Sequence, residues 1–92
     1  MKIYIAGPIT SDPDHYKEHF DKAAKRIEAY GCEPVNPALN TANSYKEYID
    51  IGLKQLSECD RIFILDGWET SEGARLERHY AQTVGMEISY ET

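Results

Sequence analysis

The chain has 92 residues, of which 41% are hydrophobic and 28% are charged, a composition typical of a small globular domain. It is too short for two domains, so we expect residues 1–92 to form one. Ten Lys and Arg against sixteen Asp and Glu give a formal net charge of −6, which disfavours binding to long nucleic acid. A small phosphorylated ligand remains compatible with this charge, because a helix N-terminus can bind a single anion.

Neither the apolar runs nor the cysteines indicate a membrane, secreted or zinc-binding protein. No run reaches the roughly 18 to 20 apolar residues of a membrane span. The sequence starts with a strand-like segment rather than a signal peptide. Cys32 and Cys59 are far apart, and neither belongs to a C-x-x-C pair. We therefore expect a cytoplasmic protein that does not bind membranes.

The first elements along the chain are a strand and a helix. Residues 2–6 form an apolar run that ends in a Gly-Pro turn, as a buried strand would. Pro13 follows two N-cap candidates and is expected at the first helical position, and Gly31 is expected just after the helix. The apolar face of this helix is predicted to consist of Tyr16, Phe20, Ala23, Ala24, Ile27 and Tyr30.

A second strand and a second helix follow. Residues 32–35 predict the strand, and the polar stretch over residues 36–43 predicts a loop. Gly52 lies near the middle of the apolar stripe of the helix, where a missing side chain allows close backbone approach. That stripe consists of Tyr45, Tyr48, Ile49, Leu53 and Leu56.

The last third of the chain predicts a strand over residues 61–65, a helix over about 72–84 and a strand over residues 86–90. The order is therefore βαβαβαβ. It implies an α/β three-layer sandwich with a four-stranded parallel sheet, of the flavodoxin-like or Rossmann-like class. Ligands of such sheets bind beyond the carboxyl ends of the strands, so the loops over residues 7–12, 36–44 and 66–72 should converge on one crevice.

Glu77 is the most informative residue for function. At about 100° per residue it falls in the middle of the apolar arc of the third helix, which consists of Ala74, Leu76, Tyr80, Ala81 and Val84. A carboxylate there must be paired, neutralised or exposed to a cavity, because burying an unpaired charge is costly. It is either a structural carboxylate, satisfied by Tyr4 or a backbone group, or a general acid/base or nucleophile with a raised pKa.

Two loops carry glycines that suit the approach of a ligand. Ser71 and Gly73 open the third helix, as in a plain N-cap or in a site that holds an anion with backbone N–H groups. The turn Gly7-Pro8-Ile9 could contact a phosphate or sugar, or be only a turn, because it lacks the spacing of known phosphate-binding loops.

Other candidates have two interpretations each. Trp68 could stack on a planar base or anchor its loop. Asn36 could reach a ligand or shape its loop. His15 and His19 have the i, i+4 spacing of metal ligands, but they flank the apolar face of the first helix and no third ligand is evident nearby.

The order and spacing of several motifs resemble the nucleoside 2-deoxyribosyltransferase superfamily over nearly the whole chain. The likeness is closest to small bacterial and phage members and more distant to the 2′-deoxynucleoside 5′-monophosphate N-glycosidases. The motifs are Tyr4-Ile5-Ala6-Gly7-Pro8-Ile9, Asn36-Pro37-Ala38, Cys59-Asp60, and the run from Gly67 through Ser71-Glu72-Gly73 to Glu77.

The resemblance implies a role for each matching residue. Glu77 would attack the anomeric carbon of deoxyribose and displace the base, and Tyr4 would orient it. Ser71 would contact the 5′-phosphate, and Gly7 would belong to the first ligand loop. The resemblance implies no metal and no organic cofactor, and it implies a homo-oligomer, since related enzymes associate through their helices.

One position departs from the family pattern. The better-characterised enzymes carry an aspartate on the helix before the third strand, where this chain has Gly52. Asp50 points to a different helical face, and Asp66 could supply an acid from the end of the third strand. The resemblance therefore implies N-glycosidic cleavage or deoxyribosyl transfer on 2′-deoxynucleosides or their 5′-monophosphates. The alternatives are a non-catalytic nucleotide-binding protein and a signalling or assembly module without a small ligand.

Overall fold

Strands and helices alternate along the chain in the computed structural model, which describes all of residues 1–92. The elements are β1 (Lys2–Ala6), α1 (Tyr16–Ala29), β2 (Glu33–Val35), α2 (Tyr45–Ser57), β3 (Arg61–Ile64), α3 (Glu72–Thr83) and β4 (Glu87–Tyr90). Two short 3-10 helices, η1 (Pro37–Leu39) and η2 (Trp68–Thr70), lie in the loops after β2 and β3. The predicted βαβαβαβ order is confirmed.

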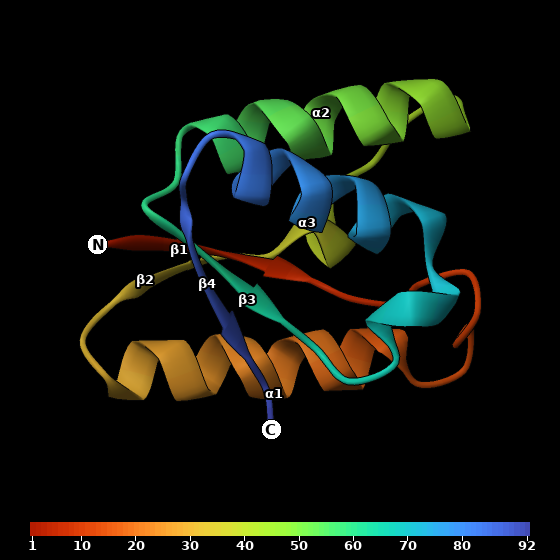
Figure 1. Ribbon diagram of the computed structural model, residues 1–92. Coiled ribbons are helices and arrows are strands. Elements are labelled where there is room, and N and C mark those ends of the chain that lie inside the picture. The colour runs from red at the N-terminus through yellow and green to blue at the C-terminus, as the bar shows by residue number, and fades with distance from the viewer.

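The four strands form one parallel sheet in the order β2-β1-β3-β4. Helix α1 covers one face of the sheet, and α2 and α3 cover the other, which confirms the predicted three-layer α/β sandwich (Figure 1). None of these helices is long and apolar enough to cross a membrane.

The central strand β1 supplies both halves of the core. Side chains alternate between the faces of a strand, so Ile3 and Ile5 pack under α1 while Tyr4 and Ala6 point toward α2 and α3. A strand that is buried on both faces has a continuous apolar sequence, as β1 does. Its register therefore places the Tyr4 side chain, which is fully buried, in the layer that holds Glu77.

Helix α1 begins three residues later than the sequence predicts. The backbone of His15, at φ −128°, departs from helical geometry, and its side chain makes no capping hydrogen bond. Pro13 therefore lies in a turn before the helix, although the N–H of Tyr16 already bonds to the carbonyl of Asp12. The prediction that Tyr30 belongs to the apolar face is also wrong, because this C-capping residue is 76% exposed.

The apolar arc predicted for the third helix is only partly buried. Ala74 and Ala81 face the core, whereas Leu76 is 43% and Val84 is 54% exposed. One flank of α3 packs on the sheet and α2, and the flank that carries Leu76 and Val84 faces solvent. Glu77 lies on the inner side of this boundary.

Candidate active site

A cavity of about 200 Å³ lies at the carboxyl end of β1, between α2 and α3. Here the strand order reverses, since β1 has β2 on one side and β3 on the other, and parallel sheets bind ligands at such a point. Strand β1 runs from left to right in Figure 1, so its carboxyl end is on the right. The wall of the cavity consists of Gly7, Ile9, Thr10, Phe20, Pro37, Tyr45, Tyr48, Ile49, Ser71, Gly73, Ala74 and Glu77, so each of the three predicted loops contributes.

Glu77 presents a carboxylate to this cavity from the second turn of α3. The Tyr4 hydroxyl donates a hydrogen bond to Oε2, and no other protein group donates to this carboxylate. Burial raises the pKa of Glu77 to about 7, although the hydrogen bond from Tyr4 acts in the opposite direction. Glu77 Oε1 is therefore free to interact with a ligand, and the group can change charge near neutral pH.

Tyr4 holds the other end of this hydrogen bond from the central strand. Its pKa is raised far above the ordinary range of a phenol, first by burial and then by the nearby Glu77 carboxylate. The Tyr4 hydroxyl therefore stays protonated and remains a hydrogen-bond donor. Both interpretations of Glu77 are compatible with this geometry, since the side chain is partly satisfied by Tyr4 and also borders a cavity.

Gly52 brings α2 into direct contact with this pair. A Cβ atom at Gly52 would lie 2.9 Å from the Tyr4 hydroxyl and 3.1 Å from Oε2 of Glu77. The close backbone approach predicted for this glycine is confirmed. Bare backbone thus lies against the Tyr4–Glu77 hydrogen bond where the resemblance implies an aspartate, and no side chain fits there unless Tyr4 or Glu77 shifts.

The N-terminus of α3 forms the opposite edge of the cavity. Ser71 is the N-cap, and its Oγ accepts a hydrogen bond of 3.1 Å from the N–H of Ala74. The N–H groups of Glu72 and Gly73 have no intrahelical acceptor at these positions. A Cβ atom at Gly73 would lie 3.3 Å from Ile49, so this glycine keeps the space between α2 and α3 open.

The loop after β1 contributes Gly7, Ile9 and Thr10 to the wall. A Cβ atom at Gly7 would lie 2.8 Å from Cβ of Leu65, so only glycine allows the chain to pass this close to the end of β3. Pro8 does not border the cavity and lies beside Gly67 instead.

Besides Pro8, three more of the predicted substrate-binding residues lie outside the cavity. Oδ1 of Asn36 accepts a hydrogen bond of 3.0 Å from the N–H of Ala38 and caps η1. The backbone N–H of Asp66 donates to the Glu91 carboxylate, and the Asp66 carboxylate accepts a hydrogen bond of 2.9 Å from the Thr92 hydroxyl. The third residue is Trp68, and all three have structural contacts in place of a ligand.

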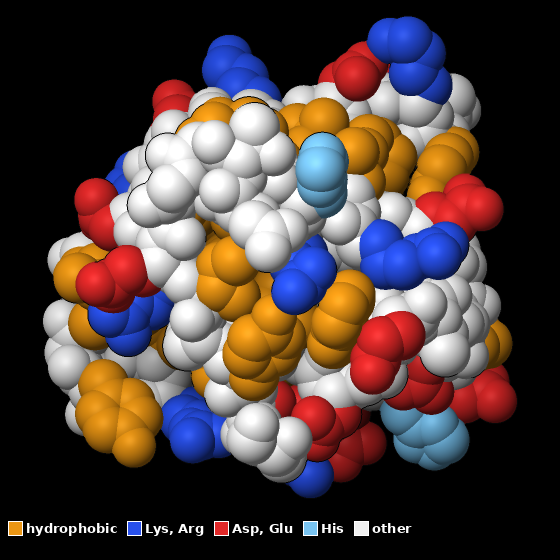
Figure 2. All heavy atoms as spheres, viewed as in Figure 1, with side chains coloured by type: hydrophobic (Ala, Val, Ile, Leu, Met, Phe, Trp, Pro, Cys, Tyr) orange, Lys and Arg blue, Asp and Glu red, His pale blue; other side chains and the backbone are white.

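Trp68 lies in a cluster at the edge of the sheet. The centroids of its ring and of the Tyr90 ring are 6.4 Å apart, and the Arg78 guanidinium lies 4.8 Å from the Trp68 centroid. Hydrophobic side chains gather over β4 in the middle of this face (Figure 2), and β4 is the edge strand that is separated from β1 by β3. This geometry supports the loop-anchoring interpretation of Trp68.

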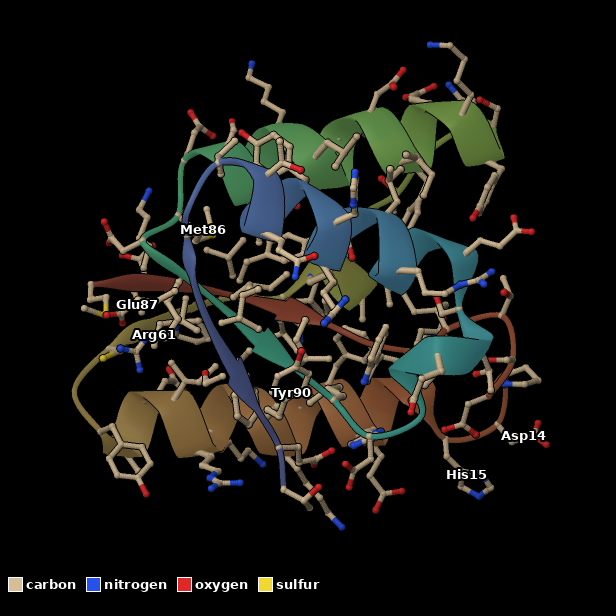
Figure 3. All side chains as sticks on the ribbon, viewed as in Figure 1. Asp14, His15, Arg61, Met86, Glu87 and Tyr90 are labelled. Carbon is tan, nitrogen blue, oxygen red and sulfur yellow. The ribbon has the colours of Figure 1, made fainter.

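The remaining charged candidates also have partners away from the cavity. Asp50 pairs with Lys46 on the exposed side of α2, at 2.6 Å. Nε2 of His19 lies 2.8 Å from Glu91, whereas His15 points outward from its loop (Figure 3). No group of three or more His, Cys, Asp or Glu side chains in residues 1–92 is arranged to hold a metal ion.

Sequence patterns alone do not predict that α2 borders the cavity. Their spacing places Tyr45, Tyr48 and Ile49 in the apolar stripe of this helix, and in the structure they line the cavity. The Tyr48 hydroxyl donates a hydrogen bond of 3.1 Å to the carbonyl of Pro37, and burial, followed by the Glu77 carboxylate, raises its pKa to about 12. The available signal was the pair of aromatics in the first turns of a helix that starts at the predicted crevice.

The sequence of residues 1–90 matches the family model of DUF4406, a domain of unknown function. The chain belongs to this family. Two solved structures have a fold similar to that of this DUF4406 chain. One is a 2-deoxyribosyltransferase from Leishmania mexicana, with a TM-score of 0.78 and 22% identity over 97% of this chain and 62% of that chain. The other is the CMP N-glycosidase BcmB from Clostridium botulinum, with a TM-score of 0.63 and 19% identity over 98% of this chain and 67% of that chain.

These matches confirm the resemblance to the nucleoside 2-deoxyribosyltransferase superfamily at the level of the fold. The DUF4406 chain spans 62% of the length of the transferase and 67% of the length of the glycosidase. No curated protein sequence matches this chain.

Proposed function

We propose that this DUF4406 chain cleaves or transfers the N-glycosidic bond of 2′-deoxynucleosides or their 5′-monophosphates. The observation that carries the proposal is the Glu77 carboxylate, which borders the cavity with one oxygen bonded to Tyr4 and the other free. The fold shared with a deoxyribosyltransferase and an N-glycosidase supports the same class of reaction.

Glu77 is the nucleophile in this proposal. Its Oε1 attacks the anomeric carbon, the bond from that carbon to the base breaks, and the electron pair leaves with the base. The Tyr4 hydroxyl keeps Oε2 in place and disperses its charge while the carboxylate is ionised. Water or a second base then attacks the same carbon and releases the carboxylate.

The rest of the wall binds the substrate. The Ser71 hydroxyl and the free N–H groups at the start of α3 would contact the sugar or its phosphate, together with the loop at Gly7. The side chains of Tyr45 and Tyr48 would flank the base, because aromatic rings pack well against planar heterocycles.

The test compares the wild type with Glu77→Gln on the four deoxynucleosides and their 5′-monophosphates, with and without an acceptor base. Released base is followed by chromatography. We expect turnover by the wild type and a loss on the order of 10²-fold or more in the variant. Undiminished turnover by Glu77→Gln would refute the proposal.

The second candidate is a nucleotide-binding protein without catalytic activity. Gly52 favours it, because no second carboxylate stands beside Glu77 to handle a proton. Such a protein would be stabilised against heat by a nucleoside or nucleotide but would release no base.

We also propose that copies of the chain associate. Leu76 on α3 and Val84 at its C-cap are exposed, and the half-buried Tyr80 lies between them at helical spacing. This α3 stripe supports an interface between copies.

A further inference from the structure

The composition of the cavity wall bears on which leaving groups this site can expel. Glu77 is its one acidic side chain, and it is occupied as the nucleophile in the function proposed above. The other polar side chains of the wall are hydroxyls, on Thr10, Tyr45, Tyr48 and Ser71. A neutral nucleobase departs as an anion unless an acid protonates it, so its departure needs a second proton donor.

The hydroxyls of the wall are poor acids. Tyr48 already donates to the Pro37 carbonyl at 3.1 Å, and its pKa is raised to about 12, so it gives up its proton reluctantly. Tyr4 donates to Glu77, and burial raises its pKa still further. Hydroxyls of the serine and threonine type are weaker acids than any carboxylic acid.

No carboxylic acid other than Glu77 lines the cavity. On α2 the nearest position is Gly52, where a Cβ atom would lie 2.9 Å from the Tyr4 hydroxyl. Asp50 is paired with Lys46, and Asp66 is bonded to Thr92. Glu72 is exposed at the first turn of α3 and does not line the cavity.

The same wall has features that attract a positively charged ring. Tyr45 and Tyr48 contribute aromatic side chains to the wall, and the faces of such rings attract cations. Glu77 adds a negative charge when ionised, and no Lys, Arg or His lines the cavity. The formal net charge of the chain, −6, favours the approach of a cation further.

We propose that this site acts on N-glycosides whose heterocycle carries a positive charge, such as a pyridinium ring or an N7-alkylated purine. The inference rests on the function proposed above. Glu77 Oε1 bonds to the anomeric carbon as the carbon–nitrogen bond breaks, and the electron pair neutralises the ring, so no proton is needed. Water then attacks that carbon, the ester bond breaks, the carboxylate returns, and one proton passes to solvent.

A matched pair of substrates tests this proposal. 7-Methyl-2′-deoxyguanosine and 2′-deoxyguanosine share their sugar and differ by one methyl group and one charge. Both are incubated with the intact chain at several pH values around 7, because Glu77 is ionised mainly above about 7 and the methylated ring keeps its full charge at lower pH. Base release is expressed relative to the uncatalysed rate of the same substrate, because the methylated one is intrinsically more labile.

We expect the acceleration of the methylated substrate to exceed that of deoxyguanosine by a factor on the order of 10² to 10⁴. This is the usual contribution of a general acid, which the cleavage of deoxyguanosine needs and the cleavage of the methylated substrate does not. One proton should be released per methylated base. The variant Tyr48→Phe should lower both rates by the same factor, whereas a specific loss with deoxyguanosine would make Tyr48 the acid and overturn the inference.

Two further outcomes separate this inference from the proposed function. Equal acceleration of both substrates that is lost in Glu77→Gln would overturn the preference for a charged ring and leave the glycosidase function standing. Absence of cleavage with either substrate or with the eight unmodified deoxynucleosides and deoxynucleotides would overturn both.

Discussion

At the scale of single residues, the site depends on a hydrogen bond between two groups whose charged forms are both disfavoured by burial. Tyr4 stays neutral and donates, while Glu77 changes protonation near pH 7. A nucleophilic carboxylate must be ionised, so the rate of the proposed reaction should rise with pH through about 7.

The first prediction concerns the pH dependence of stability. Between pH 4.5 and about 7 the folded chain keeps a proton on Glu77 that the unfolded chain has released, so this group lowers stability as the pH rises. Glu77→Gln retains an acceptor for Tyr4 and cannot ionise. We expect it to gain roughly 3 kcal/mol over the wild type above pH 7 and little near pH 4.5.

Urea denaturation at both ends of this pH range measures the effect. Glu28→Gln, at an exposed position on α1, is the control and should show no such pH-dependent gain. A gain for Glu77→Gln that is equal at both pH values would show that the Glu77 pKa is not raised.

The second prediction concerns the donor. Tyr4→Phe removes the hydrogen bond that lowers the pKa of Glu77, so the rising limb of the pH–rate profile should move to higher pH. The lost bond should cost about 1 kcal/mol of stability. Tyr48→Phe also removes a phenol near the cavity, but one that is bonded to a backbone carbonyl, so it should leave that limb in place. A pH–rate profile for each variant makes the comparison, and an unshifted limb in Tyr4→Phe would contradict the prediction.

At the scale of helices, the site depends on how closely α2 and α3 approach. Gly52→Ala would place a methyl group 2.9 Å from the Tyr4 hydroxyl, on a rigid ring that cannot bend away cheaply. We expect a loss of roughly 1 to 3 kcal/mol, despite the higher helix propensity of alanine. In Gly73→Ala the nearest atom is the flexible end of Ile49, at 3.3 Å, so the loss should be smaller.

Thermal denaturation of the two glycine variants decides this prediction. If both lose the same stability, the packing at Gly52 is not special. The pH–rate profile of Gly52→Ala gives a second readout. Displacement of Tyr4 or Glu77 should change the pKa of Glu77 and thereby the pH at which the rate rises.

The N-cap of α3 offers a matched test of ligand contact. Ser71 and Ser44 each accept a backbone hydrogen bond of 3.1 Å at the start of their helices, but only Ser71 lines the cavity. Replacing either by alanine should cost about 1 kcal/mol of stability. Only Ser71→Ala should also weaken substrate binding, as an increase in KM or a smaller ligand-induced shift in Tm. Equal effects of both variants on binding would show that Ser71 is only a cap.

At the scale of the whole molecule, the chain buries 19 of its 92 residues and leaves large apolar side chains in solvent. The sheet ends at β4, where Arg61 and Glu87 face one another across β3 and β4 (Figure 3).

If the α3 stripe joins two copies, Leu76→Lys should shift the chain to its 10.5 kDa monomer. Leu39→Lys, at a more exposed leucine on η1, should not. Sedimentation equilibrium distinguishes the two, and a wild type that is monomeric at micromolar concentration would refute the association.

The sequence by itself determined the order of elements and the face on which each key residue lies. Strand and helix periodicity are local properties, so residues 2–6 indicate a strand and Glu77 is found on an apolar arc without knowledge of the fold. Gly52 is identified in the same way, from its place in the stripe of α2. The prediction that the helix begins at Pro13 is wrong, because the turn that precedes α1 depends on the backbone geometry of His15 rather than on composition.

Only the tertiary structure decided which of these residues meet. Tyr4 and Glu77 are 73 residues apart in sequence, and their contact depends on the stacking of α3 over β1. The same packing directs Trp68 and Asp66 toward the sheet edge and the C-terminus, and it turns Tyr48 into the cavity. Periodicity assigns a side chain to a face, but the partner across that face comes from another element, whose position depends on packing.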